Sequence, residues 1–158
     1  MSNRTLAAAL AVAALALAGT ASASPGHHGH TIKLTEAHPD AQPTFVDTGK
    51  PGPTVGDVGV FRDDVLRADG STAGTLRQVC TLVDLVGGPP TSTFECVGSL
   101  ALKEGTITIA GPFVPAAPEQ SAAITGGTGA YANARGEMTL HARDELGSEF
   151  DFVYHIIG

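Results

Sequence analysis

The chain has 158 residues and a formal net charge of −7, from nine Lys and Arg against sixteen Asp and Glu. It contains 20 glycines, 10 prolines, two cysteines and no tryptophan. An acidic chain with scattered cations has no electrostatic reason to bind nucleic acid or anionic lipid, so we expect neither as a partner. The length suffices for one domain with a modest core.

The first 23 residues have the features of a secretory signal peptide. Arg4 precedes an apolar run over residues 6–18, and Ala21-Ser22-Ala23 offers small residues to a signal peptidase. The apolar run is short for a bilayer span, and no later run is longer. We therefore expect a secreted protein, cleaved after Ala23, without a membrane span. Loss of Arg4 leaves the mature chain with a charge of −8.

A short histidine-containing segment follows the signal. Residues 24–30, SPGHHGH, have no periodicity and predict a flexible tail. Its three histidines could hold a transition metal loosely, but a closed site needs further ligands from a fixed framework. We therefore expect no metal site, and we assign residues 31–158 to a single folded domain.

The rest of the chain alternates between short strand patterns and turn residues. Strands are expected at 31–36, 55–66, 73–83, 93–102, 106–110, 121–125, 137–143 and 149–156. Residues 40–54 carry three prolines and two glycines and indicate a loop. No long helix is expected. Regularly spaced strands joined by hairpin turns predict an all-β fold, either a small barrel or a sandwich.

The two cysteines suggest one disulfide, because an exported chain meets an oxidising environment. If residues 77–83 and 92–102 form a hairpin that turns at residues 87–90, Cys80 and Cys96 face each other across the two strands. We expect a Cys80–Cys96 bridge with a structural role. Two buried free thiols are the alternative.

A glycine run at residues 124–136, ITGGTGAYANARG, contains the pattern G-x-G-x-x-A. A dinucleotide-binding loop must follow a parallel strand and open a helix, whereas this chain continues into a strand pattern from Glu137. No P-loop lysine follows either. The glycines therefore indicate a tight corner between strands, with Ile124 and Tyr131 packed inward.

Three motifs in order resemble the allene oxide cyclase and dirigent superfamily of barrels. They are the glycine run, the segment GDVGVF at residues 56–61, and the segment TITIAGPF at residues 106–113. The resemblance extends from about Val55 to Gly136. It implies one antiparallel barrel of about eight strands, often trimeric, with an apolar cavity and no cofactor.

The cyclase branch implies catalysis assisted by a glutamate on the first strand. The alignment places Lys33 at that position, with Glu36 further along. Glu36 would face the cavity only if the register differed by an odd step. Asp57 is a further catalytic candidate. Of the adjacent Asp63 and Asp64, only one can enter the cavity, because neighbouring residues on a strand point to opposite faces.

The cavity is expected to hold a small apolar molecule of the oxylipin or phenolic type. The expected ligand contacts are Val60, Phe61, Val79, Phe113, Tyr131 and Arg135. Three functions stay open: binding alone, a cofactor-free cyclase, isomerase or dirigent-type activity, and a structural, envelope-associated barrel filled by its own side chains. For the enzyme, the polar candidates are Lys33, Glu36, Asp57 and Arg135.

Overall fold

The computed structural model of the chain describes residues 29–37, 43–145 and 149–157. The expected signal peptide, residues 1–23, and residues 24–28 of the expected tail lie outside this part of the chain. His30, which sequence analysis assigned to the tail, is the first residue of a strand. Among the described residues, no helix has both the length and the apolar character needed to cross a membrane.

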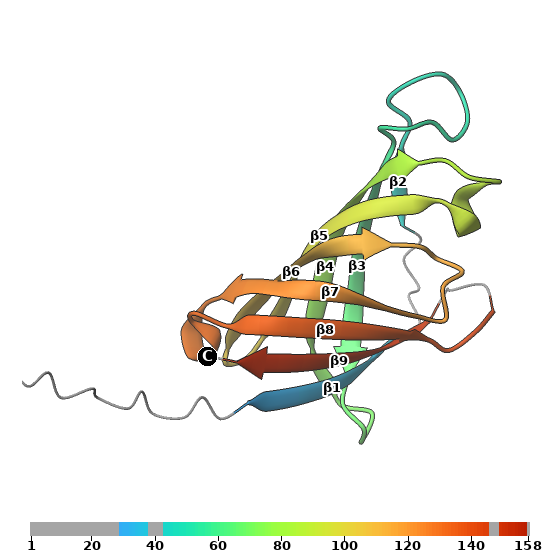
Figure 1. The fold of residues 1–158 in the computed structure, drawn as a ribbon. Helices are drawn as coiled ribbons and strands as arrows, with labels where there is room; N and C mark the ends of the chain where they lie inside the picture. The colour runs from blue at the N-terminus through green and yellow to red at the C-terminus, as the bar shows by residue number, and fades with distance from the viewer. Residues whose placement is uncertain (1–28, 38–42, 146–148, 158) are drawn as a thin grey trace, which may run out of the picture.

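Strands account for most of the described chain (Figure 1). They are β1 (His30–Glu36), β2 (Thr44–Val46), β3 (Val58–Leu66), β4 (Thr72–Asp84), β5 (Thr93–Leu102), β6 (Gly105–Phe113), β7 (Glu119–Gly127), β8 (Arg135–Ala142) and β9 (Phe150–Ile157). Two single-turn 3₁₀ helices, η1 (Pro89–Thr91) and η2 (Gly129–Tyr131), lie in the connections after β4 and β7. The segment predicted as a loop at 40–54 is interrupted by β2, so that prediction was wrong at residues 44–46.

The strands form one antiparallel sheet in the order β1-β9-β8-β7-β6-β5-β4-β3-β2. The sheet closes where Thr35 and Glu36 of β1 pair with Leu66 and Val65 of β3. β2 pairs with the first residues of β3 and stands as an extra strand beside the closed barrel. The predicted all-β barrel of about eight strands is therefore confirmed.

One end of the barrel is filled by its own side chains. Inward-facing residues alternate with outward-facing ones along each strand, as the pleat requires. The fully buried members of this core include Val65, Leu76, Leu100, Ile107 and Tyr154, each at 0% exposure. The core cluster extends to Ile124, Ala134, Met138 and Ile156. This packing fixes the strands that continue toward the opposite end.

The glycine run closes the packed end. It forms the end of β7, the short turn η2 and the entry to β8, and no longer helix follows. Gly129 has a φ of 61°, and a Cβ there would lie 2.4 Å from the carbonyl oxygen of Glu104. Gly136 has a φ of 133°, with the His155 carbonyl oxygen 2.0 Å from any Cβ. The predicted corner between strands is confirmed, because only glycine fits both positions.

Candidate functional site

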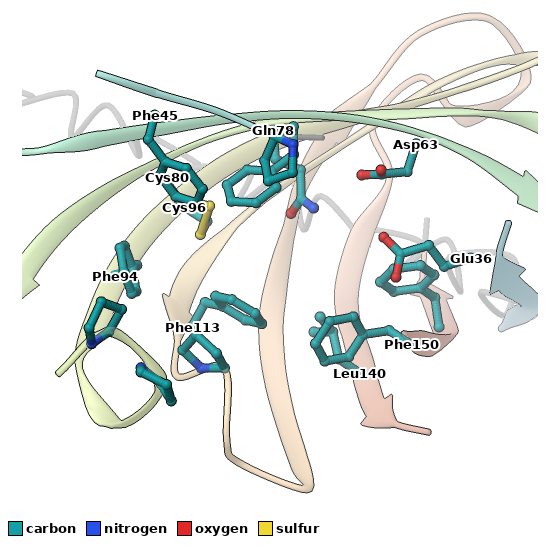
Figure 2. A pocket seen from close by; sticks show the side chains of 16 residues that line it. Glu36, Phe45, Asp63, Gln78, Cys80, Phe94, Cys96, Phe113, Leu140 and Phe150 are labelled. Atoms are coloured by element: carbon teal, nitrogen blue, oxygen red, sulfur yellow. A yellow bond between two sulfur atoms is a disulfide. The ribbon is translucent and has the colours of Figure 1, made fainter. Parts of the chain in front are cut away.

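The opposite end of the barrel contains a cavity of about 410 Å³ (Figure 2). Its lining comes from nearly every strand and from the loops at that end: Glu36, Pro43, Phe45, Phe61, Asp63, Gln78, Cys80, Pro89, Pro90, Phe94, Cys96, Phe113, Pro115, Leu140, Phe150 and Phe152. The chain has six phenylalanines, and all six line this cavity. We call it the phenylalanine pocket. Its volume lies in the range of sites that hold small molecules.

The aromatic side chains support one another around the pocket. Phe113 and Phe150 meet edge to face with ring centroids 5.6 Å apart, and Phe150 lies 6.4 Å from Phe152. Phe45 of the extra strand β2 makes a similar edge contact with Phe61 at 6.0 Å. Phe45 is still 66% exposed, so its ring lies at the mouth. Such pairs are favourable beyond simple burial and shape a wall suited to flat, ring-containing ligands.

Three polar side chains interrupt this apolar wall: Glu36 of β1, Asp63 of β3 and Gln78 of β4. The carboxyl groups of Glu36 and Asp63 lie on the same side of the pocket (Figure 2). Oε2 of Glu36 is buried and has no hydrogen-bond partner among the described residues. The described lining contains no Lys, Arg or His. The described lining therefore offers a buried carboxyl oxygen without a hydrogen-bond partner, and no cation.

Burial is the main cause of a raised pKa at Glu36. Burial and the nearby Asp63 carboxylate raise the pKa of Glu36 from 4.5 to about 8, against a smaller opposing effect from the backbone N–H of Phe150. The pKa of Asp63 is also raised, by burial first and by Asp64, while Arg62 lowers it. At neutral pH, Glu36 is mainly an uncharged carboxylic acid that can donate a hydrogen bond.

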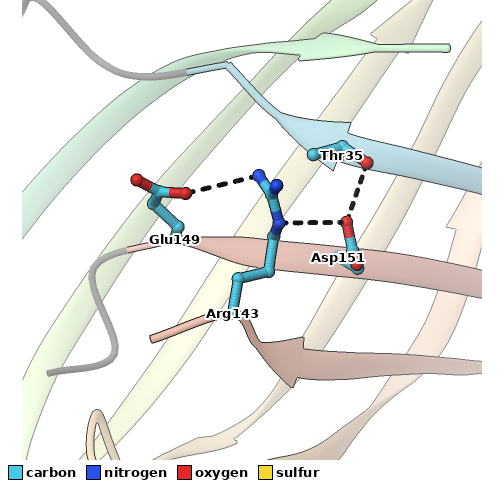
Figure 3. A network of polar contacts seen from close by, with 4 residues as sticks. All are labelled: Thr35, Arg143, Glu149 and Asp151. Carbon is cyan, nitrogen blue, oxygen red and sulfur yellow. Dashed lines mark hydrogen bonds and ion pairs between the residues drawn. The ribbon is translucent and has the colours of Figure 1, made fainter. Parts of the chain in front are cut away.

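A polar network fixes the strand ends that carry Glu36 and Phe150 (Figure 3). The Thr35 hydroxyl donates to Asp151 Oδ1 at 2.7 Å, which links β1 to β9. Arg143, just beyond β8, lies 3.3 Å from Glu149 Oε2 and 3.8 Å from Asp151 Oδ1. Adjacent side chains on a strand point to opposite faces. Because these contacts hold Thr35 on the outer face, they keep the next residue, Glu36, pointing inward.

Cys80 and Cys96 form the predicted disulfide. The two residues are direct cross-strand partners on β4 and β5, with their Cα atoms 4.0 Å apart. Both side chains face inward and line the pocket. Sequence analysis gave this bridge a structural role alone, whereas the structure also makes it part of the pocket wall.

The structure turns Glu36 into the pocket and Lys33 onto the outer face. Along β1, Leu34 is buried and Glu36 lines the cavity, while Lys33 is exposed. The alignment that put Lys33 in the cyclase glutamate position was therefore wrong for the side chain's direction. The observed strand has the alternative register, shifted by an odd number of residues, in which Glu36 faces the cavity. Phe61 and Phe113, both predicted ligand contacts, also line the pocket.

Two predicted ligand contacts, Val60 and Val79, lie on the outside of the barrel. Their side chains are 42% and 49% exposed, and neither lines the pocket. Each neighbours a residue that does line it, Phe61 and Cys80, and alternation sends adjacent side chains to opposite faces. The prediction that these valines line the cavity was wrong for that reason.

Tyr131 and Arg135 lie at the packed end, away from the pocket. Tyr131 belongs to η2 and packs against the core, and Arg135 begins β8 and donates to the Ala134 carbonyl at 2.7 Å. Neither lines the pocket, so both predicted ligand contacts were wrong. The register of the last strands pairs Arg135 with Ile157 at the end of β9.

Asp57 holds a loop together and does not reach the pocket. Its carboxylate accepts hydrogen bonds from the backbone N–H groups of Thr48 and Thr54, at 2.9 and 2.7 Å, and from the Thr54 hydroxyl at 3.1 Å. These bonds lower the pKa of Asp57, and the bond from the Thr48 backbone N–H has the largest effect on it. The structure lends no support to the expected catalytic role of Asp57, since its carboxylate fixes the turn before β3.

Several pocket residues went unpredicted, above all Gln78, Phe94, Phe150 and Phe152. A signal was present for Asp63, because it follows Phe61 by two residues on the same strand and so shares its face. Among the described residues, no group of three His, Cys, Asp or Glu could hold a metal ion. The polar groups available for chemistry in the aromatic pocket are the carboxyl groups of Glu36 and Asp63 and the amide of Gln78.

The sequence and the fold were compared with known proteins. The profile described as "Allene oxide cyclase barrel like domain" matches residues 31–151. No curated protein matches the sequence. Pyocyanin demethylase is a similar solved structure, with 29% identity and a TM-score of 0.65 over 82% of this chain and 100% of that chain.

Two further solved structures share the fold at lower identity. A pterocarpan synthase dirigent protein is 17% identical, with a TM-score of 0.62 over 86% of this chain and 87% of that chain. A Diels-Alderase from Streptomyces koyangensis is 17% identical, with a TM-score of 0.60 over 85% of this chain and 71% of that chain. At this identity the likeness shows a common barrel and nothing of shared chemistry.

Proposed function

Because the chain belongs to the allene oxide cyclase-like barrel family, we propose that it binds a small, uncharged, ring-containing molecule in the phenylalanine pocket. The observation that carries the proposal is the buried Glu36 Oε2 atom, which has no hydrogen-bond partner among the described residues, inside a mainly aromatic wall. A buried polar atom without a partner costs free energy, and a ligand that accepts its hydrogen bond removes that cost. The similar solved structures, named as a demethylase, a dirigent protein and a Diels-Alderase, support a small-molecule role.

The charges of the lining favour a phenolic ligand over an oxylipin with a free carboxylate. The Asp63 carboxylate disfavours a second anion, and the described lining offers no cation to pair with one. The pocket also lacks Arg135, the residue expected to bind a ligand carboxylate. A hydroxyl or carbonyl oxygen suits Glu36, because its acid form donates a hydrogen bond.

A second candidate function is a cofactor-free rearrangement or cyclisation of the bound molecule. It is favoured by the pKa of about 8 at Glu36, which lies near the neutral pH at which a general acid is most effective. In this reaction Glu36 donates its proton to a ligand oxygen while the aromatic wall holds the ring in a reactive conformation, and the Glu36 carboxylate takes a proton back from the rearranged ligand. The neighbouring Asp63 carboxylate helps to raise the pKa of Glu36. It can also accept a hydrogen bond from a hydroxyl group of the ligand.

A matched pair of fluorescent probes tests the binding proposal. N-phenylnaphthylamine is neutral, and anilinonaphthalene sulfonate carries the same ring system with one negative charge. We expect the neutral probe to bind at least about tenfold more tightly, a difference of about 1.4 kcal/mol. The Glu36→Gln/Asp63→Asn variant, which removes both carboxyl groups, should narrow this gap. Equal affinities for the two probes in the wild type, or a gap unchanged in the variant, would contradict the proposal.

Displacement of the neutral probe then identifies candidate ligands. Phenolic compounds should displace it, whereas fatty acids with a free carboxylate should not. Each compound that displaces the probe is incubated with the protein, and its products are separated by chiral chromatography. If the protein is an enzyme, the single variant Glu36→Gln should keep binding and lose conversion, because an amide donates a hydrogen bond and no proton. Equal conversion by wild type and Glu36→Gln would exclude Glu36 as the acid.

A further inference from the structure

The three polar residues of the phenylalanine pocket form a diagonal stripe across neighbouring strands. Glu36 of β1 is paired with Val65 of β3, and Asp63 lies two residues before Val65 on the same face. Asp63 is paired with Leu76 of β4, and Gln78 lies two residues after Leu76. Diagonal neighbours of this kind are roughly 7 Å apart, so the two ends of the stripe, Glu36 and Gln78, are roughly 14 Å apart at their Cβ atoms. We call these three residues the polar stripe.

Gln78 presents a free amide to the pocket. It belongs to the lining, and no hydrogen bond joins its side chain to another group in the described part of the chain. Gln120 shows the contrast, because its amide donates to the carbonyl oxygen of Val114 and accepts from the same residue's N–H. Gly98 is the direct partner of Gln78 on β5, and a Cβ there would lie 3.0 Å from Gln78 Cγ. The glycine therefore leaves room for a side chain whose polar end has no structural contact.

The wall across from the polar stripe is apolar. Figure 2 shows Phe113, Leu140 and Phe150 on the other side of the pocket from Asp63 and Gln78. A polar group of a ligand placed against these side chains would lose its hydrogen bonds to water and gain none in return. The pocket therefore suits a ring system whose polar groups all lie along one edge, with the bare edge toward the apolar wall.

On the basis of the proposed function, we propose that the ligand is a fused-ring molecule with two oxygen substituents on the same long edge, and that Gln78 selects it. One oxygen accepts a hydrogen bond from the acid form of Glu36, and the other bonds with the amide of Gln78, which can donate or accept. Asp63, between them, accepts a hydrogen bond from a hydroxyl group of the ligand. A single oxygen does not serve both ends of the stripe, because the ends are roughly 14 Å apart at their Cβ atoms.

Two isomers of dihydroxynaphthalene test the proposal by displacement of the neutral probe. The 2,7-isomer carries both hydroxyls on one long edge, whereas the 2,6-isomer carries them on opposite edges, so the two match in size and apolar area. The wild type should bind the 2,7-isomer at least about tenfold more tightly than the 2,6-isomer or 2-naphthol, because only the 2,7-isomer bonds with both ends of the stripe. Equal affinities for the two isomers in the wild type would overturn the proposal.

Gln78→Met tests the role of the amide, because methionine keeps the length of the side chain and removes its polar end. The variant should bind the 2,7-isomer no more tightly than 2-naphthol, while its affinity for 2-naphthol stays that of the wild type. Val79→Met is the matched control, since Val79 is the next residue on β4 but is 49% exposed on the outer face. It should keep the wild-type preference. A Gln78→Met variant that also keeps this preference would overturn the selection by Gln78.

The binding of 2-naphthol separates a failure of this proposal from a failure of the proposed function. If 2-naphthol displaces the neutral probe but the two isomers bind equally, the pocket still holds a phenolic ligand, and only the two-oxygen ligand is overturned. If none of the three compounds displaces the probe, both are overturned. Circular dichroism confirms that Gln78→Met and Val79→Met fold, and the comparison of isomers in the wild type needs neither variant.

Discussion

At the scale of single residues, Glu36 combines an inward direction, burial and an acidic neighbour. Its direction follows from the phase of β1, in which Leu34 and Glu36 share the inner face. Its pKa of about 8 follows mainly from burial and from Asp63. The sequence placed Glu36 among the candidates, but it could not decide between Lys33 and Glu36. A shift of the strand pairing by one residue moves every side chain to the opposite face of the sheet. Because both faces of this short strand carry polar residues, the sequence does not show which face points inward.

The raised pKa of Glu36 predicts a pH dependence of the free energy of unfolding. Between the unfolded value of 4.5 and the folded value of about 8, the native state holds a proton that the unfolded state releases. Stability is therefore fully present below the unfolded pKa and is lost as the pH rises toward the folded one, with a slope of at most about 1.4 kcal/mol per pH unit. Urea unfolding of wild type and Glu36→Gln across this window measures the slope. In Glu36→Gln, the free energy of unfolding should change much less with pH. Equal slopes in the two proteins would show that the pKa of Glu36 is the same in the folded and unfolded states.

At the scale of elements, the β4–β5 hairpin was the part best predicted from sequence. The turn residues at 87–90 set a midpoint that pairs Cys80 with Cys96, and the structure has that pair. The inward faces of β3 and β4 were predicted less well. Val60 and Phe61 are neighbours, as are Val79 and Cys80, so alternation allows only one of each pair inside. Alternation and turn residues located the strands, and the resemblance to known barrels indicated how they assemble, but neither decided which side chains of each strand point inward.

The disulfide should contribute to both stability and pocket shape. Replacing both cysteines, as Cys80→Ala/Cys96→Ala, should lower the free energy of unfolding by about 3 kcal/mol, because the bridge closes a loop of 16 residues in the unfolded chain. It should also weaken binding of the neutral probe, since both sulfur atoms belong to the wall. Urea unfolding and probe titration measure the two effects. An unchanged free energy of unfolding would show that the disulfide restricts the unfolded chain very little.

At the scale of the whole molecule, the barrel divides into a packed end and an open end. Branched aliphatic residues and the glycine run fill and close the first, and all six phenylalanines gather at the second. The barrel itself could be predicted, because regular strand spacing and three ordered motifs point to it. The pocket could not, since its phenylalanines are spread from residue 45 to residue 152 and meet only when the sheet closes. The hypothesis of a purely structural barrel, filled by its own side chains, fits the packed end but not the end that contains the pocket.

The crystal structure of the protein with naphthol, a neutral phenolic ligand, tests the central claim most directly. We expect the ring between Phe61, Phe113 and Phe150, with its oxygen within hydrogen-bonding distance of Glu36. Three neighbouring valines on the outside of the barrel, Val60, Val79 and Val97, provide an internal comparison, because they are exposed and apolar. Naphthol bound only on these outer valines, with none in the phenylalanine pocket at saturating concentration, would contradict the proposed ligand site.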